Sequence, residues 1–452
     1  MIFNYRFLAR IIVEAVTPVV VKSGEKNILT DGAVLRDVND LPYIPGTSIA
    51  GVLRHAWKDE KIDVDTILGF QHGDKGEGSK LIFSEARMLG SGGRVIDGLQ
   101  DINDDSFLKN YKQLPIRQHV RITDRGVAAD KGKFDEEIVY AGTRFCFELE
   151  MLSKEDIESF FDELLATLQS HTFRLGSGTR NGFGEIKVVS LWKRVLNLQD
   201  KEDLEAYLSK SSNLEASKGW YTEKVNLVSK ETEWTSYELQ LMPSDFFLFG
   251  SGFGDDEADM TPVKEQRVLW NGESAQLGEY SYLVPASSVK GAIAHRVAFH
   301  YNKLKGIYAD LLSDEEKKNV IGKNNDAVKS LFGSEGDEKG DGKLRGNVLF
   351  SDLYLEYLSY KLLNHVAIDR FTGGAIDGAL FTEKVTYGNG QGYALKIFVN
   401  SLSIENDVMK ALELALDDIC KGMLPLGGGV NRGHGTFSGV ILKNGEELCV
   451  ER

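Results

Sequence analysis

The sequence repeats itself, and this repeat constrains the fold more than any other feature. Four short blocks in the first half of the 452-residue chain recur in the second half, in the same order and far apart. One match of this kind could arise by chance, but four in register indicate a duplicated unit. The paired blocks are residues 44–51 and 284–291, 81–85 and 348–352, 119–126 and 365–373, and 175–184 and 426–435. The chain is therefore predicted to contain two domains of the same fold.

Each copy predicts the same order of secondary structure. Residues 3–13 and 237–241 alternate between apolar and polar side chains, which is typical of a half-buried strand. The blocks at 44–51 and 284–291 each predict a helix, with hydroxyl side chains that suit an N-cap. Further strands are expected at 81–83, 143–149 and 185–189 and at 348–350, 393–399 and 436–442, and further helices at 157–168 and 408–419. The order strand–helix–strand–strand–helix–strand is the ferredoxin-like arrangement, so the fold class is α+β.

The domain limits follow from the repeat. We expect a first ferredoxin-like domain at 1–195, a charged, partly helical linker at 196–233 and a second domain at 234–452. In each domain the segment between the second and third strands is longer than an ordinary loop. This segment predicts either a projecting hairpin or a surface insertion without fixed structure.

Composition limits the functions that the chain can perform. Its formal net charge of −15 counts against a non-specific nucleic-acid binder, although a local basic groove would still attract phosphates. No apolar stretch approaches the roughly 20 residues that span a bilayer, and the N-terminus lacks the pattern of a signal peptide. Cys146, Cys420 and Cys449 form no CxxC pair, so neither a zinc site nor a disulfide framework is expected. These features predict a cytoplasmic protein with no membrane partner.

The glycine-rich blocks near the end of each half are candidate phosphate-binding loops. Their exposed N–H groups could hold phosphates with the help of an arginine, or they could be ordinary turns between a helix and a strand. A dinucleotide-binding motif is excluded by context, because that motif follows a strand and opens a helix. The candidate RNA ligands are Gly176, Gly178, Arg180 and Gly182 in the first copy and Gly427, Gly429, Arg432 and Gly433 in the second.

Other polar residues in the repeated blocks are further candidates. Helix N-termini bind anions, so Ser48, Ser288 and Lys290 are candidate RNA ligands, although each helix start could also be purely structural. Arg125 and Arg370 lie in the predicted hairpins and are candidates for the same role. His55 and His295 occupy equivalent helical positions and are either acid–base groups or structural residues, and the same alternatives hold for His119 and His365.

One aspartate precedes the first helix of each half. These residues are Asp31 and Asp259. A loop aspartate usually forms a turn, and composition alone does not reveal any other chemistry.

The ordered set of blocks resembles the RAMP superfamily, and most of all the Cas-seven-like backbone subunits of type III CRISPR effectors. The resemblance covers nearly the whole chain, once per half. It implies an RRM-related core, thumb hairpins inserted in each domain, and three kinds of partner: a CRISPR guide RNA, a target RNA and other effector subunits. The fused pair is similar to the double backbone subunits of subtype III-D effectors.

The resemblance also implies a catalytic role for the loop aspartates. In catalytic members of the family, an aspartate before the Pro-Gly helix supports metal-dependent cleavage of target RNA. Asp31 matches this position by its spacing to Asp37 and Pro45. Asp259 matches less well, because Asp255 and Asp256 crowd its longer loop. Mg²⁺ or Mn²⁺, held by Asp31 and Asp259, is the implied cofactor.

Three other functions stay open on the sequence alone. The chain could be a guide-RNA-binding scaffold without catalytic activity. It could also be a metal-independent endoribonuclease that processes guide RNA through His55 or His295. An enzyme that uses a dinucleotide is a distant further alternative.

Overall fold

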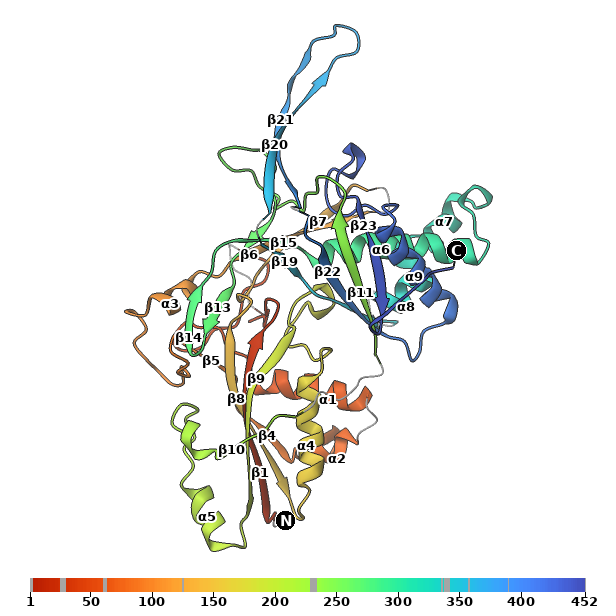
Figure 1. Ribbon diagram of the computed structural model, residues 1–452. Helices are drawn as coiled ribbons and strands as arrows, with labels where there is room; N and C mark the ends of the chain where they lie inside the picture. The colour runs from red at the N-terminus through yellow and green to blue at the C-terminus, as the bar shows by residue number, and fades with distance from the viewer. Residues whose placement is uncertain are drawn as a thin grey trace.

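The computed structural model has two α+β halves, each built on one antiparallel sheet (Figure 1). It describes residues 3–24, 30–59, 63–123, 126–227, 234–334, 336, 342–356, 358–388 and 390–451.

The first sheet has the strand order β9-β1-β8-β4, with β10 added at one edge and β5 paired to β8. Helices α1 and α4 form its two crossovers. The alternating residues of β1 explain its burial, because Phe7, Ile11 and Val13 enter the same core as Phe161 of α4. The main elements are β1 (Tyr5–Ala15), α1 (Gly46–Asp59), β4 (Leu81–Phe83), β8 (Arg144–Ser153), α4 (Glu158–Ala166) and β9 (Ile186–Asn197). The smaller ones are α2 (Val64–Leu68), β2 (Phe70–His72), β3 (Lys75–Glu77), β5 (Arg87–Met88), α3 (Ser106–Lys109), α5 (Lys201–Leu208) and β10 (Glu223–Lys224).

The second sheet repeats this topology as β23-β11-β22-β18, with β24 at its edge. The main elements are β11 (Trp234–Pro243), α6 (Ala286–Leu304), β18 (Val348–Phe350), β22 (Tyr393–Asn400), α9 (Asn406–Cys420) and β23 (Phe437–Lys443). The smaller ones are β12 (Lys264–Glu265), β13 (Val268–Asn271), β14 (Ser274–Leu277), β15 (Ser281–Val284), α7 (Asp314–Val320), α8 (Asp326–Phe332), β16 (Gly333–Ser334), β17 (Leu344–Arg345), β19 (Leu353–Leu355) and β24 (Glu446–Glu447). Both halves therefore follow the order that the repeat predicts.

A β-hairpin is inserted between the second and third core strands of each half. The first hairpin consists of β6 (Ile116–Ile122) and β7 (Ala128–Glu137), and the second of β20 (Ser359–Ile368) and β21 (Ala375–Tyr387). The second hairpin projects away from the body, as Figure 1 shows at its top. The prediction of inserted hairpins is confirmed, whereas Arg125 lies outside the described residues.

The segment predicted as a linker packs on the first domain. Helix α5 gives it the expected partly helical character, and β10 pairs with β9. Leu214 and Tyr221 are buried, and the guanidinium of Arg10 on β1 donates to the carbonyl of Leu214 and to Ser217. Arg10 points to the sheet face opposite Phe7 and Ile11, so this segment covers the face that the helices leave free. Residues 228–233 lie outside the described part of the chain.

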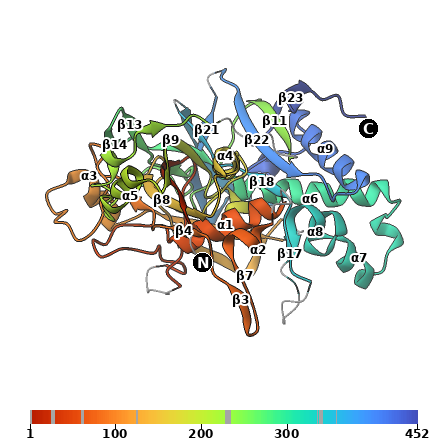
Figure 2. The same ribbon diagram turned by 90° about the horizontal axis from the view of Figure 1, so that it is seen from below.

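The hairpin β13–β14 of the second half packs on the first half. Figure 2 shows it beside α3, far from α6 and α9 of its own half. Val268 and Ala275 belong to the core of the first domain. The indole N–H of Trp270 donates to the carbonyl of Gly142 at 2.7 Å. This hairpin interlocks the two halves.

The start of α6 differs from the sequence prediction. Its N-cap is Pro285, and no hydroxyl of the block caps it. The N–H of Ala286 instead donates to Asp352 at 2.9 Å. The hydroxyl cap predicted for this helix is wrong. Asp352, which follows β18 and lies 66 residues after Ala286, accepts the first helical N–H instead.

Candidate RNA interface

The base of each hairpin contains the same histidine, aromatic and carboxylate arrangement. His119 stacks on Phe134 with ring centroids 4.8 Å apart, and its Nε2 lies 3.4 Å from Glu136. The second hairpin repeats this with His365, Phe381 and Glu383 at the corresponding places. The two hairpins can therefore be aligned residue by residue, and this alignment defines equivalent positions in the two halves.

Glu383 is the most strongly bound of these carboxylates. It is fully buried and accepts hydrogen bonds from His365, His434 and Arg432. Burial raises the pKa of Glu383, but these three partners outweigh it and hold the pKa below its usual value. Arg432, a predicted RNA ligand, is thus ion-paired at the hairpin base, where a third of its side chain is exposed.

The aspartate predicted in each half lies beside the returning strand of its hairpin. Asp31 donates its N–H to Asp135 at 2.9 Å, and the N–H of Asp135 points back to the Asp31 carboxylate at 3.4 Å. In the second half the carboxylate of Asp259 accepts the N–H of Thr382 at 2.8 Å. Asp135 and Thr382 are equivalent, since each directly precedes the buried glutamate. Asp31 and Asp259 therefore occupy the same place in the two domains.

The two aspartate sites differ in their carboxylates. The first offers Asp31 and Asp135, both accessible to solvent, and the hydrogen bond from Asp31 holds the pKa of Asp135 below its usual value. The second has a threonine in place of Asp135. Asp255, in the second loop, is bound by Lys384. Within the described ranges, no group of three or more His, Cys, Asp or Glu side chains is arranged to hold a metal. Mg²⁺ is often held by only one or two carboxylates with water and phosphate, so the donor set of the first site fits such an ion better than that of the second.

The glycine loops have matching geometries. Gly178 and Gly429 have φ angles of 68° and 69°, in the left-handed region that favours glycine. A Cβ at Gly176 would lie 2.5 Å from the carbonyl of Val20, and one at Gly427 equally close to that of Leu248. Contacts within the chain thus require glycine at these positions, and phosphate binding by them stays a prediction.

The first glycine loop is enclosed by the second half. A Cβ at Gly182 would collide with Ala286 at the start of α6. Arg180 donates to the carbonyl of Gly346 at 2.8 Å, and Lys290 donates to Asn181 at 2.9 Å. Burial, followed by the charge of Arg180, lowers the pKa of Lys290 to about 8. By contrast, no atom of the described residues lies within 4 Å of a Cβ built on Gly433.

A cavity of about 730 Å³ opens between the halves next to this loop. Three predicted RNA ligands line it, namely Ser48, Gly176 and Arg180. The basic side chains of Lys22, His55, Arg174 and Arg345 also line it, together with Trp234, and none of the described lining residues is acidic. A site with this charge on a chain of net charge −15 is suited to a polyanion with an aromatic base.

Lys22 connects the cavity with the first aspartate loop. Lys22 lines the cavity, pairs with Glu136 at 3.0 Å, and has its Cε 3.3 Å from a Cβ built on Gly32. Gly32 directly follows Asp31. Lys22 therefore contacts both the cavity and the loop that carries Asp31.

Comparison with known proteins bears on both halves. A family model described as the RAMP superfamily matches residues 12–187 and 238–438. The chain belongs to the RAMP superfamily. Among solved structures, a chain of a type III-B Cmr-beta complex in its apo state covers 40% of this RAMP protein and 96% of its own length. That pair has 15% sequence identity and a TM-score of 0.32. No curated protein matches this chain.

The remaining candidates of the RAMP domains lie further apart. Ser288 and His295 are exposed on α6, and Arg370 is exposed in the turn of the second hairpin. His119 is buried at the hairpin base, which favours its structural interpretation.

Among the described helices, none is long and apolar enough to cross a membrane.

The sequence did not reveal several residues of the site. Asp135, Lys22, Trp234 and Arg345 lie outside the conspicuous blocks, and Trp234 and Arg345 reach the cavity from the other half. Glu136 and Glu383 could have been found from the repeat. Glu136 lies 17 residues after His119 and Glu383 lies 18 residues after His365, and each pairs with that histidine.

Proposed function

We propose that this RAMP protein is a guide-RNA-binding backbone subunit of a type III CRISPR effector that cleaves target RNA. The observation that carries the proposal is the position of Lys22, which lines the basic cavity and lies beside the Asp31 loop. Lys22, Arg180 and Arg345 supply positive charge, and Trp234 supplies a face on which a base can stack. The resemblance of the repeated blocks to type III backbone subunits supports the same class of partner.

The first half carries the better cleavage site. Its loop holds Asp31 in place through the paired hydrogen bonds with Asp135, and Lys22 lies beside the same loop. A divalent ion bound there would polarise the scissile phosphate and lower the pKa of the attacking hydroxyl or water. Asp31 and Asp135 would hold this ion, while Lys22 would neutralise charge on a neighbouring phosphate. The Asp259 site would be weaker because Thr382 replaces the second carboxylate.

The experiment is cleavage of an end-labelled target RNA by the assembled effector, mapped on a denaturing gel. We expect two cuts, a strong one lost in Asp31→Asn and a weaker one lost in Asp259→Asn, each with guide binding intact. Asp135→Asn should slow the first cut selectively. Asp40→Asn, an exposed carboxylate near the end of the same loop, is the matched control.

The alternatives are distinguished by the same assay. Intact guide binding without any cutting by the parent complex would leave a scaffold. Cutting that persists in EDTA and in the Asp31→Asn/Asp259→Asn double variant would exclude the metal mechanism. His55, which lines the cavity, would then be the first residue to test as an acid–base group.

A further inference from the structure

The contact between the halves depends on two buried arginines of the first half. Arg117 on β6 donates to both carboxylate oxygens of Glu265, at 2.7 and 2.6 Å, and to Asp352 at 2.5 Å. Desolvation lowers the pKa of Arg117, but the charges of Asp352 and Glu265 outweigh it and hold the pKa well above its usual value. Arg174, also buried, donates to the carbonyl of Phe350 and to Ser351. Arg117 thus satisfies both acids of the second half, and Arg174 binds the residues directly before Asp352.

The second half has neither arginine at its own outer end. The position of Arg117, two residues before the hairpin histidine, is Leu363 in the second hairpin. The position of Arg174, directly before the glycine-loop leucine, is Pro425. The second glycine loop around Gly433 is open, as the space around its Cβ position shows. At these two positions the outer end therefore has apolar side chains, whereas the inner contact has arginines.

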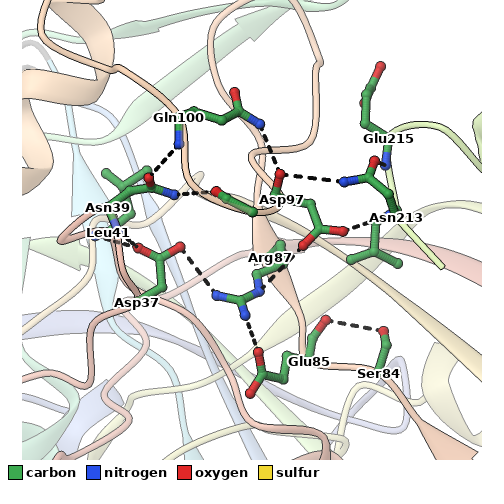
Figure 3. A network of polar contacts seen from close by, with 12 residues as sticks. Asp37, Asn39, Leu41, Ser84, Glu85, Arg87, Asp97, Gln100, Asn213 and Glu215 are labelled. Atoms are coloured by element: carbon green, nitrogen blue, oxygen red, sulfur yellow. Dashed lines mark hydrogen bonds and ion pairs between the residues drawn. The ribbon is translucent and has the colours of Figure 1, made fainter.

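The first half has the complementary difference at its outer end. By the repeat, Asp37 and Glu85 stand where the second half has Glu265 and Asp352. Both acids are already bound by Arg87 of their own domain, which lies 3.3 Å from Asp37 and also contacts Glu85 (Figure 3). The equivalent of Arg87 in the second half is Tyr354, which donates to Glu265.

Asp37 and Glu85 do not require a second arginine, because Arg87 already pairs with both. Asp37 also accepts the N–H groups of Asn39 and Leu41, at 2.8 and 3.0 Å (Figure 3). A hollow of about 450 Å³ in the first half is lined by Gly46, Ala50 and Phe83. By the repeat, these residues stand where the second half has Ala286, Lys290 and Phe350, which contact the glycine loop of the first half and the Arg174 before it. The corresponding surface is thus present at the outer end, but its charges are satisfied internally.

We propose that this chain does not stack on copies of itself and that its second-half end binds an unlike subunit instead. Stacking would cover the charged Arg87 network with Leu363 and Pro425, and burying charges without new hydrogen bonds costs free energy. The end that carries Leu363 fits a subunit with apolar residues in place of Glu265 and Asp352. The identification of this unlike subunit as part of an effector rests on the proposed function, whereas the absence of self-stacking does not.

Sedimentation velocity of the purified full chain tests this proposal. The parent should sediment as a single 50.2 kDa species over a wide range of concentrations. Leu363→Arg/Pro425→Arg/Arg87→Leu restores both arginines and frees both acids, so it should form dimers and longer oligomers that dissociate in high salt. Leu362→Arg, on the opposite face of the same strand, is the control and should stay monomeric.

Two results would overturn the proposal. One is concentration-dependent oligomerisation of the parent chain that Gly433→Trp, in the open loop, abolishes. The other is a triple variant that is folded by circular dichroism and remains monomeric. If the triple variant does not fold, Leu363→Arg/Pro425→Arg in the background that retains Arg87 must still associate more strongly than the parent. Loss of RNA cleavage would change none of these outcomes, so the two proposals fail separately.

Discussion

Lys290 shows how a single side chain is altered by its place between the halves. It belongs to the repeated helix block, but its first-half equivalent is Ala50. Its amino group is held by Asn181 of the first glycine loop, and burial lowers its pKa to about 8. The cation that the sequence predicts as an RNA ligand is thus only partly charged just above neutral pH.

This lowered pKa predicts a pH dependence of guide-RNA binding. Below pH 8 Lys290 is protonated and attracts phosphate, and above pH 8 the charge is lost, so RNA affinity should fall as pH rises from 7 to 9. Lys290→Gln should bind more weakly at pH 7 and lack this fall. Filter binding of the parent, Lys290→Gln and the exposed control Lys303→Gln measures the effect. A parallel pH profile of the parent and Lys290→Gln would contradict the assignment.

The same shift has a consequence for folding. The unfolded chain titrates Lys290 near 10.5 and the folded chain near 8, so between these values the unfolded chain binds more protons. The contribution of Lys290 to stability therefore rises with pH across this window. RNA phosphates near Lys290 would oppose the shift and favour proton uptake on binding.

At the scale of elements, the sequence predicts the helices and strands that occur in both halves and misses a hairpin that occurs in only one. The core strands, the two crossover helices and both hairpins follow from hydrophobic periodicity and from blocks that occur twice. The hairpin β13–β14 has no counterpart in the first half, where Asp37 and Leu41 close a short turn at the same place. Its contacts with Gly142 and Ala141 join residues more than 100 positions apart, which local patterns do not encode.

The interlocking hairpin predicts a stability effect at Trp270. This residue packs edge-on to Phe107, receives the guanidinium of Arg144 over its ring and donates to Gly142. Trp270→Ala should lower the free energy of unfolding by about 3 kcal/mol. Leu269→Ala, exposed on the same strand, should change it by less than about 0.5 kcal/mol. Urea titrations followed by circular dichroism compare the two, and equal effects would show that the indole does not hold the halves together.

At the scale of the whole molecule, the two domains differ mainly in what their ends contact. The duplicated fold places Asp31 and Asp259 equivalently, so the sequence alone identifies both loops. It does not reveal that Asp135 accompanies only the first, or that the cavity needs Trp234 and Arg345 from the other half. These features depend on how the halves pack, and this packing also requires side chains outside the repeated blocks, such as Arg117 and Glu265.

Arg117 is the residue on which this packing most depends. Removing it leaves Glu265 and Asp352 buried without a counter-charge, and breaking a buried pair in this way costs about 3–5 kcal/mol. Because the loss falls at the junction rather than in either core, Arg117→Leu should separate one calorimetric unfolding transition into two, with the halves melting independently. Arg121→Leu, exposed on the same strand, should melt like the parent. Differential scanning calorimetry distinguishes these outcomes: a single unshifted transition in Arg117→Leu would mean that the other contacts, among them β13–β14, couple the halves without Arg117. A split transition would mean that the spacing between the two aspartate sites is set by this one buried arginine and its acids.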